Sequence, residues 1–288
     1  MTRGLLCSMA AALTLAACSD APTSNSDNSN RPELITKGGE LDGNRHPGTV
    51  LIIMELLVNG KSTPAFRCSG SLISPTVVLT AGHCAGENAT ATRPAEFSGM
   101  RIFNEANVQA DLTYPGPGGP HTIEATSWKS HPLFTEAQFF LHDVGIIHLA
   151  QPVNLPSNQY GRLPAAGQLD GLQPGNQTTF TAVGYGLQYI NPVKIESQRV
   201  RMFATPRLVQ VNSNHTGSFS LLLSNNANTG GTCFGDSGGP NYLGSGSSAT
   251  NVVAGVTSFS RSADHCVGSG GVFRLDKQDV LDFIHGEL

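Results

Sequence analysis

Short apolar runs recur along most of this chain, and turn residues separate them. Runs of strand length bounded by glycine, proline, asparagine and serine are typical of strands joined by turns. The segment 114–120 is so rich in proline and glycine that it can only form an irregular loop. Strands are therefore predicted over the segments 49–58, 71–80, 144–149, 178–183, 252–259 and 271–275.

One helix is predicted, at the C-terminus. Asp276 can cap its first turn, and the apolar residues that follow recur at helical spacing. They are Val280, Leu281, Phe283 and Ile284. The pattern thus favours an all-β chain that ends in a helix over about residues 276–286.

Composition agrees with this fold class. Glycine at 33, proline at 17 and a charged fraction of 13% favour a turn-rich all-β protein over a helical bundle. A chain of 288 residues can bury a sizeable core, in one large domain or two small ones. The net charge of -4 and the lack of a basic run give no indication of a nucleic-acid partner.

The N-terminus predicts export. Arg3 precedes the apolar stretch 4–17, which is short for a membrane span and typical of a secretory signal, so residues 1–17 are predicted to be removed. Leu15-Ala16-Ala17-Cys18 resembles the bacterial lipobox, in which the cysteine is lipidated; the alternative is an ordinary signal with an incidental Cys18. The polar segment 18–34 is predicted to be a flexible linker or a pro-segment. The protein is expected to be lipid-anchored to the cell envelope or secreted.

Four cysteines remain once Cys18 and Cys7, which lies in the removed segment, are set aside, and these four predict disulfides. An even number in an exported chain implies pairing, although three pairings are open to four cysteines. A zinc site is disfavoured because no CxxC pair is present. The residues concerned are Cys68, Cys84, Cys233 and Cys266.

A candidate nucleophile lies in the segment 235–240, Gly-Asp-Ser-Gly-Gly-Pro, whose glycines leave room around Ser237. Serine needs a base to take its proton, a group that orients the base and donors aimed at the oxyanion. His83 stands in the sequence Thr-Ala-Gly-His-Cys, and Asp143 opens an apolar run. The backbone N–H groups of Gly235 and Ser237 are candidate donors.

These segments, in the order His, Asp, Ser, resemble the trypsin/chymotrypsin-like serine endopeptidases. The segments 68–74, 181–186 and 255–260 add to the resemblance, which covers the chain from about Ile35 to its end. It implies two packed six-stranded antiparallel β-barrels, over about residues 35–150 and 160–275. It also implies the disulfides Cys68–Cys84 and Cys233–Cys266.

The resemblance further implies the roles of the site residues. His83 would be the general base, Asp143 would orient it and stabilise the imidazolium, and Ser237 would attack the substrate. His142 is rejected as the base, because adjacent residues of a strand point to opposite faces. The chemistry would need no organic cofactor and no metal.

Specificity is expected from a primary pocket with Gly231 at its bottom. The resemblance implies Ser260 and Gly271 as its walls, on a cleft strand that includes Ser258 and Phe259. Trypsin-like enzymes carry Asp where this chain has Gly231, so a basic substrate side chain would lack a partner here. Medium or large neutral side chains are therefore expected.

Activation departs from the family pattern. Family zymogens are cleaved to free an Ile whose amino group pairs with the Asp before the serine, here Asp236. Ile35 resembles that residue, but Leu34 precedes it and Arg31 is followed by proline, so the usual processing site is not evident. Alternatively, another cation would satisfy Asp236, since a buried unpaired carboxylate costs several kcal/mol.

The predicted function is peptide-bond hydrolysis, by a monomer, of protein or peptide substrates. The alternative is a catalytically silent binding protein with this fold at the cell surface, although no triad residue is lost. An esterase with a Gly-x-Ser-x-Gly elbow is excluded by the order of the triad. The glycosylation sequons at Asn88, Asn176 and Asn214 are expected to be unused.

Overall fold

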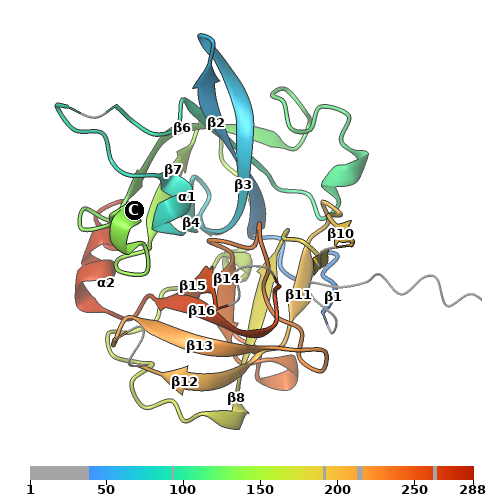
Figure 1. The fold of residues 1–288 in the computed structure, drawn as a ribbon, viewed down its shortest axis with the longest axis vertical. Coiled ribbons are helices and arrows are strands. Elements are labelled where there is room, and N and C mark those ends of the chain that lie inside the picture. Colours follow the sequence, from blue (N-terminus) through green and yellow to red (C-terminus); the bar gives the residue numbers. More distant parts are fainter. Residues whose placement is uncertain (1–38, 93, 191–192, 213–216, 262–264) are drawn as a thin grey trace, which may run out of the picture. The chain divides into compact units, whose positions relative to one another are not determined.

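The structure, a computed structural model, describes residues 39–288 apart from residue 93 and the segments 191–192, 213–216 and 262–264. The first part of this chain closes into a six-stranded antiparallel barrel (Figure 1). Neighbouring strands follow one another around the ring in the order β2 (Thr49–Val58), β3 (Lys61–Ser74), β4 (Val77–Thr80), β7 (Gly145–Leu149), β6 (Thr122–Ser130) and β5 (Gly99–Phe103).

The predicted strand 49–58 is confirmed as β2. Its side chains point alternately to the two faces of the sheet, and both faces are covered by apolar residues. Val50 and Ile52 point into the main core, whereas Leu51 and Ile53 join a second apolar cluster with Tyr185. Successive strand residues face opposite sides, so an unbroken apolar run fits a strand covered on both.

The second part of the chain forms another six-stranded antiparallel ring, which closes because β8 pairs with β14. Its strands are β8 (Gly175–Gly184), β12 (Arg207–Val211), β13 (Ser220–Asn225), β16 (Gly268–Arg274), β15 (Val253–Ser260) and β14 (Pro240–Leu243). Short strands β1 (Glu40–Leu41) and β11 (Met202–Ala204) extend the sheet from β8, and β9 (Tyr189–Ile190) pairs with β10 (Ile195–Glu196). The prediction of two six-stranded barrels is confirmed.

Helices are few and short. The α-helices of the described chain are α1 (Gly82–Ala85) and the predicted C-terminal helix, α2 (Gln278–His285). Single 3₁₀ turns cover Val108–Ala110, Glu136–Gln138, Ser157–Gln159 and Gly246–Ser248. No helix among the described residues is both long and apolar enough to cross a membrane.

The prediction that Asp276 caps α2 is wrong. Lys277 occupies the cap position and makes no side-chain cap bond. The carboxylate of Asp276 instead contacts the buried guanidinium of Arg274, with Nε and Nη2 at 2.9 and 2.7 Å from its oxygens, and accepts the N–H of Leu169. A buried arginine needs a carboxylate partner more than an exposed helix end needs a cap.

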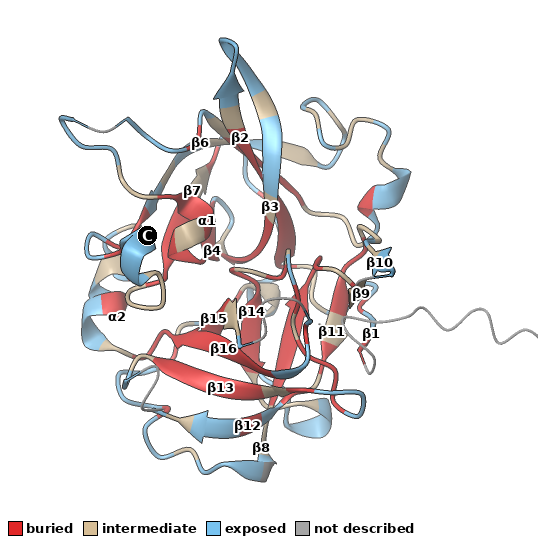
Figure 2. Ribbon diagram, in the orientation of Figure 1, coloured by how far each residue is buried: buried red, intermediate tan, exposed pale blue. Residues whose placement is uncertain are grey.

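The core runs from one barrel into the other, and the buried residues follow the strands of both (Figure 2). Val50 and Ile147 from the first barrel share one apolar cluster with Val256 and Phe273 from the second. The C-terminal segment also contacts the first barrel, where Glu287 pairs with Lys129 at 2.5 Å. The shared apolar cluster packs the two barrels against each other.

Candidate active site

The pairing of β4 with β7 brings His83 and Asp143 together. Thr80, at the end of β4, lies opposite Gly145 at the start of β7. Residues just beyond these two positions are therefore neighbours, with His83 in α1 and Asp143 before β7. Gly82 permits this approach, because a Cβ there would lie 3.1 Å from the backbone nitrogen of Val144.

The carboxylate of Asp143 is fully buried and held by three donors. Its oxygens lie 3.1 and 3.0 Å from Nδ1 of His83, and the backbone N–H of His83 donates to it at 2.9 Å. The hydroxyl of Ser258, on β15 of the second barrel, donates to it at 2.5 Å. The carboxylate thus fixes the plane of the imidazole and directs Nε2 away from itself.

The pKa of His83 is raised from its ordinary value. Burial opposes the charged form, but the charge of Asp143 and its hydrogen bond outweigh burial, with smaller contributions from Glu136 and Glu96. The side chain of His83 remains 23% exposed. The ring can therefore exchange a proton with a bound molecule and hold it against the buried carboxylate.

Ser237 lies in a tight segment pinned to both barrels. Its carbonyl accepts the N–H of Ser69 on β3 at 2.8 Å, and the N–H of Gly238 donates to Thr257 on β15 at 2.8 Å. Gly238 has a φ of 76°, and a Cβ there would collide with Thr80. No hydrogen bond joins the hydroxyl of Ser237 to His83 in this structure, and such contacts are often loose without a substrate.

Two backbone donors next to Ser237 are free of protein acceptors. Among the described residues, the N–H groups of Gly235 and Ser237 make no hydrogen bond. Gly235 has a φ of 95°, which favours glycine, and a Cβ there would lie 3.0 Å from Nε of Arg67. Both donors can bind an anionic oxygen that develops beside the serine.

The predicted disulfide pairing is confirmed, with Cys68 bonded to Cys84 and Cys233 to Cys266. The first ties β3 to α1, and the second ties the serine segment to the loop before β16. Each contributes about 2–4 kcal/mol. Sγ atoms of the first pair lie near His83, but atoms joined in a disulfide do not bind a metal.

Asp236 is also fully buried, but its partners are only backbone donors. Its oxygens accept the N–H groups of Gly186 at 2.7 Å and Cys233 at 2.9 Å. Burial raises its pKa to about 6, although these two bonds and the charge of Arg67 act in the opposite direction. No ion pair of Asp236 occurs among the described residues, and Ile35 lies outside them.

A cavity of about 250 Å³ opens beside Ser237. Ser258, Phe259 and Ser260 line it as predicted, but Gly231 and Gly271 do not. The ring of Phe259 lies where a side chain at Gly271 would be, and Asn225 packs in the same way against Gly231. Among the residues that the structure describes, none that lines this cavity is charged; the other lining residues are Phe139, Thr232, Cys233, Phe234, Thr257 and Cys266.

The sequence did not indicate Phe139, which reaches the cavity from the loop before Asp143 and meets Phe259 edge-on at 6.2 Å. The available signal was the aromatic pair Phe139-Phe140, which stands a few residues before Asp143 in the sequence. His142 turns away from the site, but not because of strand alternation: His142 and Asp143 lie before β7, and His142 has a left-handed φ of 55°. Its ring stacks on His131 at 4.7 Å, and its Nε2 lies 3.2 Å from Asp279.

Comparisons with known proteins agree with this geometry. The family model described as Trypsin matches residues 47–274. Chymase of Rattus norvegicus is 28% identical over 215 residues, covering 71% of this chain and 77% of that protein. Brachyurin of Leptuca pugilator is 29% identical over 204 residues, covering 69% and 77% respectively. The solved HL collagenase superposes with a TM-score of 0.60 at 21% identity, over 84% of this chain and 93% of that one.

Proposed function

Because this chain belongs to the trypsin family of serine endopeptidases, we propose that His83, Asp143 and Ser237 are its catalytic triad. The observation that carries the assignment is the buried carboxylate of Asp143, which contacts Nδ1 of His83 at 3.0 Å and also accepts its backbone N–H. Asp42 makes the same two contacts with His46, but only His83 and Asp143 lie, with Ser237, inside the segment 47–274 that the Trypsin family model matches.

The mechanism follows from these positions. The hydroxyl of Ser237 attacks the substrate carbonyl carbon while Nε2 of His83 takes its proton, and the carbonyl oxygen becomes an oxyanion. The N–H groups of Gly235 and Ser237 stabilise that oxyanion. The imidazolium then gives its proton to the departing amine, which leaves an acyl-enzyme. Water, deprotonated by His83, attacks the ester, and the proton returns to Ser237 as the acid is released.

We propose that the residue before the cleaved bond is neutral and that Phe259 limits its size. The cavity beside Ser237 has aromatic walls and, in the part of the chain that the structure describes, no carboxylate to bind a basic side chain. The Phe259 ring also lies over Gly271, so it takes up space in the pocket that a large aromatic side chain of the substrate would need. This narrows the expectation from medium or large side chains to medium ones.

Export and maturation complete the proposal. Two disulfides are typical of an oxidising compartment. The signal at 1–17, the lipidated Cys18, the linker 18–34 and cleavage before Ile35 all lie outside the described residues. After that cleavage, the new amino group of Ile35 would supply the cation that Asp236 lacks. Labelling with a palmitate analogue, compared between wild type and Cys18→Ala, tests the anchor.

A peptide library tests the reaction and its specificity together. The wild type is expected to cleave after neutral residues, and Ser237→Ala to cleave nothing. Phe259→Ala should raise kcat/KM for Phe and Tyr relative to Leu by about tenfold, since each methylene matched in a pocket changes the ratio by 10-fold or more. Cleavage after Arg or Lys by the wild type would contradict the proposed pocket.

A catalytically silent binding protein is the second candidate. The position of Phe259 over Gly271 favours it, because the ring reduces the space for a substrate side chain. If Phe259→Ala gains no hydrolysis and wild type has none, this second candidate is preferred.

A further inference from the structure

A second cavity, of about 600 Å³, shares no residue with the one beside Ser237. This volume lies within the range of small-molecule sites. Two arginines and a histidine line it, together with amide and hydroxyl side chains. No carboxylate of the described residues lines it, although the chain has a net charge of -4. The lining residues are Arg45, His46, Pro47, Ser157, Asn158, Gln159, Arg162, Tyr242, Ala249, Thr250 and Asn251.

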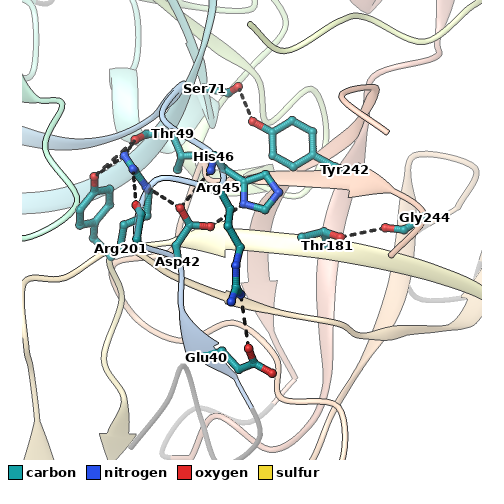
Figure 3. Close-up of polar contacts among 12 residues, drawn as sticks. Glu40, Asp42, Arg45, His46, Thr49, Ser71, Thr181, Arg201, Tyr242 and Gly244 are labelled. Atoms are coloured by element: carbon teal, nitrogen blue, oxygen red, sulfur yellow. Dashed lines mark hydrogen bonds and ion pairs between the residues drawn. The ribbon is translucent and has the colours of Figure 1, made fainter. Parts of the chain in front are cut away.

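His46 is held in one orientation in this cavity. Its Nδ1 lies 2.5 Å from Oδ1 of Asp42, and its ring stacks on Tyr242 of β14 at 5.4 Å (Figure 3). Nδ1 is thus committed to the carboxylate, and Nε2 has no partner among the described residues. Since the side chain is 22% exposed, the Nε2 edge is the one that the ring presents to a ligand.

Asp42 is itself anchored, which makes this orientation rigid. Its second oxygen accepts the backbone N–H of His46 at 3.0 Å and pairs with Nε of the buried Arg201 at 2.9 Å. Arg201 also donates to the carbonyls of Thr49 and Gly43. Figure 3 shows the carboxylate of Asp42 between Arg201 and His46. The pKa of Asp42 is lowered: burial opposes ionisation, but the bond and charge of His46 and the charge of Arg201 prevail.

The two arginines of the cavity have exposed side chains. The backbone of Arg162 is fixed against the start of β15, through bonds to Asn251 and Val253, yet its guanidinium has no partner in the described part of the chain. Arg45 lies over Phe203 at 4.6 Å and contacts Glu40 at 3.3 Å. That pair is more than half exposed, and such pairs contribute little, so a ligand can replace Glu40.

We propose that this cavity binds a small ligand that carries phosphate or sulfate esters. Guanidinium groups match tetrahedral oxyanions with paired N–H donors, and Arg45 and Arg162 supply them without a competing acid in the lining. His46 adds a donor when protonated, and the amide and hydroxyl side chains suit the neutral hydroxyls of a sugar-like carrier. The His46–Asp42 pair is assigned no hydrolytic role, because it lies outside the segment 47–274 that the Trypsin family model matches.

Titration calorimetry of the full chain at constant ionic strength tests the proposal. The probes are glucose 6-phosphate, sucrose octasulfate and, as a carboxylate, citrate. One saturable site for an ester is expected, about tenfold weaker in Arg162→Gln because a charge-assisted bond contributes roughly this factor. Binding should be lost in the Arg45→Gln/Arg162→Gln double variant and unchanged in Arg207→Gln, an exposed arginine on β12. Circular dichroism and peptide hydrolysis check that each variant folds.

Three results would overturn the proposal. They are no saturable binding of either ester, equal binding by the double variant and Arg207→Gln, and tighter binding of citrate than of both esters. Tighter binding of either ester supports the site, and the ester that binds more tightly shows whether the site prefers a phosphate or a sulfate group. His46→Gln should weaken binding less than the double variant, because it removes one donor and keeps both guanidinium groups.

Discussion

Two aspartates of this protein, Asp143 and Asp236, are equally buried but differ in their partners. Asp143 contacts an imidazole, a backbone N–H and the hydroxyl of Ser258. Asp236 accepts only the backbone N–H groups of Gly186 and Cys233, and burial raises its pKa to about 6. Burial is therefore the same for both carboxylates, and the difference between the two sites lies in the groups that each carboxylate contacts.

The difference is built into the neighbouring backbone. Antiparallel pairing of β4 with β7 brings an imidazole to Asp143. Asp236 instead lies against Gly184 and Gly186, where any Cβ would collide with its carboxylate. The first site holds its partner permanently, whereas the second is shaped to admit a group from elsewhere, which we propose is the amino group of Ile35.

Asp143→Asn tests the first half of the comparison and should have the largest effect. The asparagine would favour the wrong tautomer of His83, so kcat should fall about 10⁴-fold with little change in KM. Initial rates on a neutral peptide substrate measure this. Asp279→Asn, which removes the exposed contact with His142, is the matched control and should change kcat less than twofold. A loss below tenfold in Asp143→Asn would show that this carboxylate does not orient the base.

The pH dependence of stability tests the second half. The pKa of Asp236 is about 6 when folded and 3.8 as a free group, so the folded state binds the proton more tightly. The contribution of Asp236 to the free energy of unfolding is therefore fully present below pH 4. It falls by about 3 kcal/mol as the pH rises from about 4 to 6. The measurement is the free energy of unfolding of wild type minus that of Asp236→Asn across this window.

The chain cleaved before Ile35 provides the decisive control for Asp236. Its new ammonium group should pair with the carboxylate, lower its pKa and abolish the loss of stability between pH 4 and 6. An identical pH profile before and after cleavage would mean that the amino group of Ile35 does not reach Asp236.

Ser258→Ala should have the smallest effect of the three. It removes the 2.5 Å bond to Asp143 but leaves both contacts of that carboxylate with His83. A lost bond to a charged group corresponds to about 1.5 kcal/mol at the low end, so kcat should fall about tenfold. Ser260→Ala, which alters the same cavity wall, should change KM and not kcat. If Ser258→Ala also changes only KM, the hydroxyl serves the pocket alone.

Local patterns predicted much of the fold and the outline of the site. The largely apolar segment 49–58 is β2, and the glycine-rich context of Ser237 corresponds to a segment in which Gly238 has a positive φ. The division into two barrels came from family resemblance, because closure depends on the pairing of β8 with β14, about 60 residues apart in the sequence.

Contacts between distant residues could not be predicted. The ring of Phe259 over Gly271 changes the pocket from the expected shape, and nothing in either segment signals it. The pairing of Asp42 with Arg201 joins residues separated by 159 positions. Asp276 lies one residue before the cap position of α2, and the buried Arg274 takes its carboxylate. In each case a tertiary partner overrides a local preference.

The central claim is that Ser237 is an activated nucleophile, and intact-protein mass after treatment with a fluorophosphonate probe tests it most directly. The account predicts a single adduct on the protein, lost in Ser237→Ala and retained in Ser260→Ala. If neither the full chain nor the chain cleaved before Ile35 forms an adduct, although both are folded, Ser237 is not activated and the proposed peptidase mechanism is wrong.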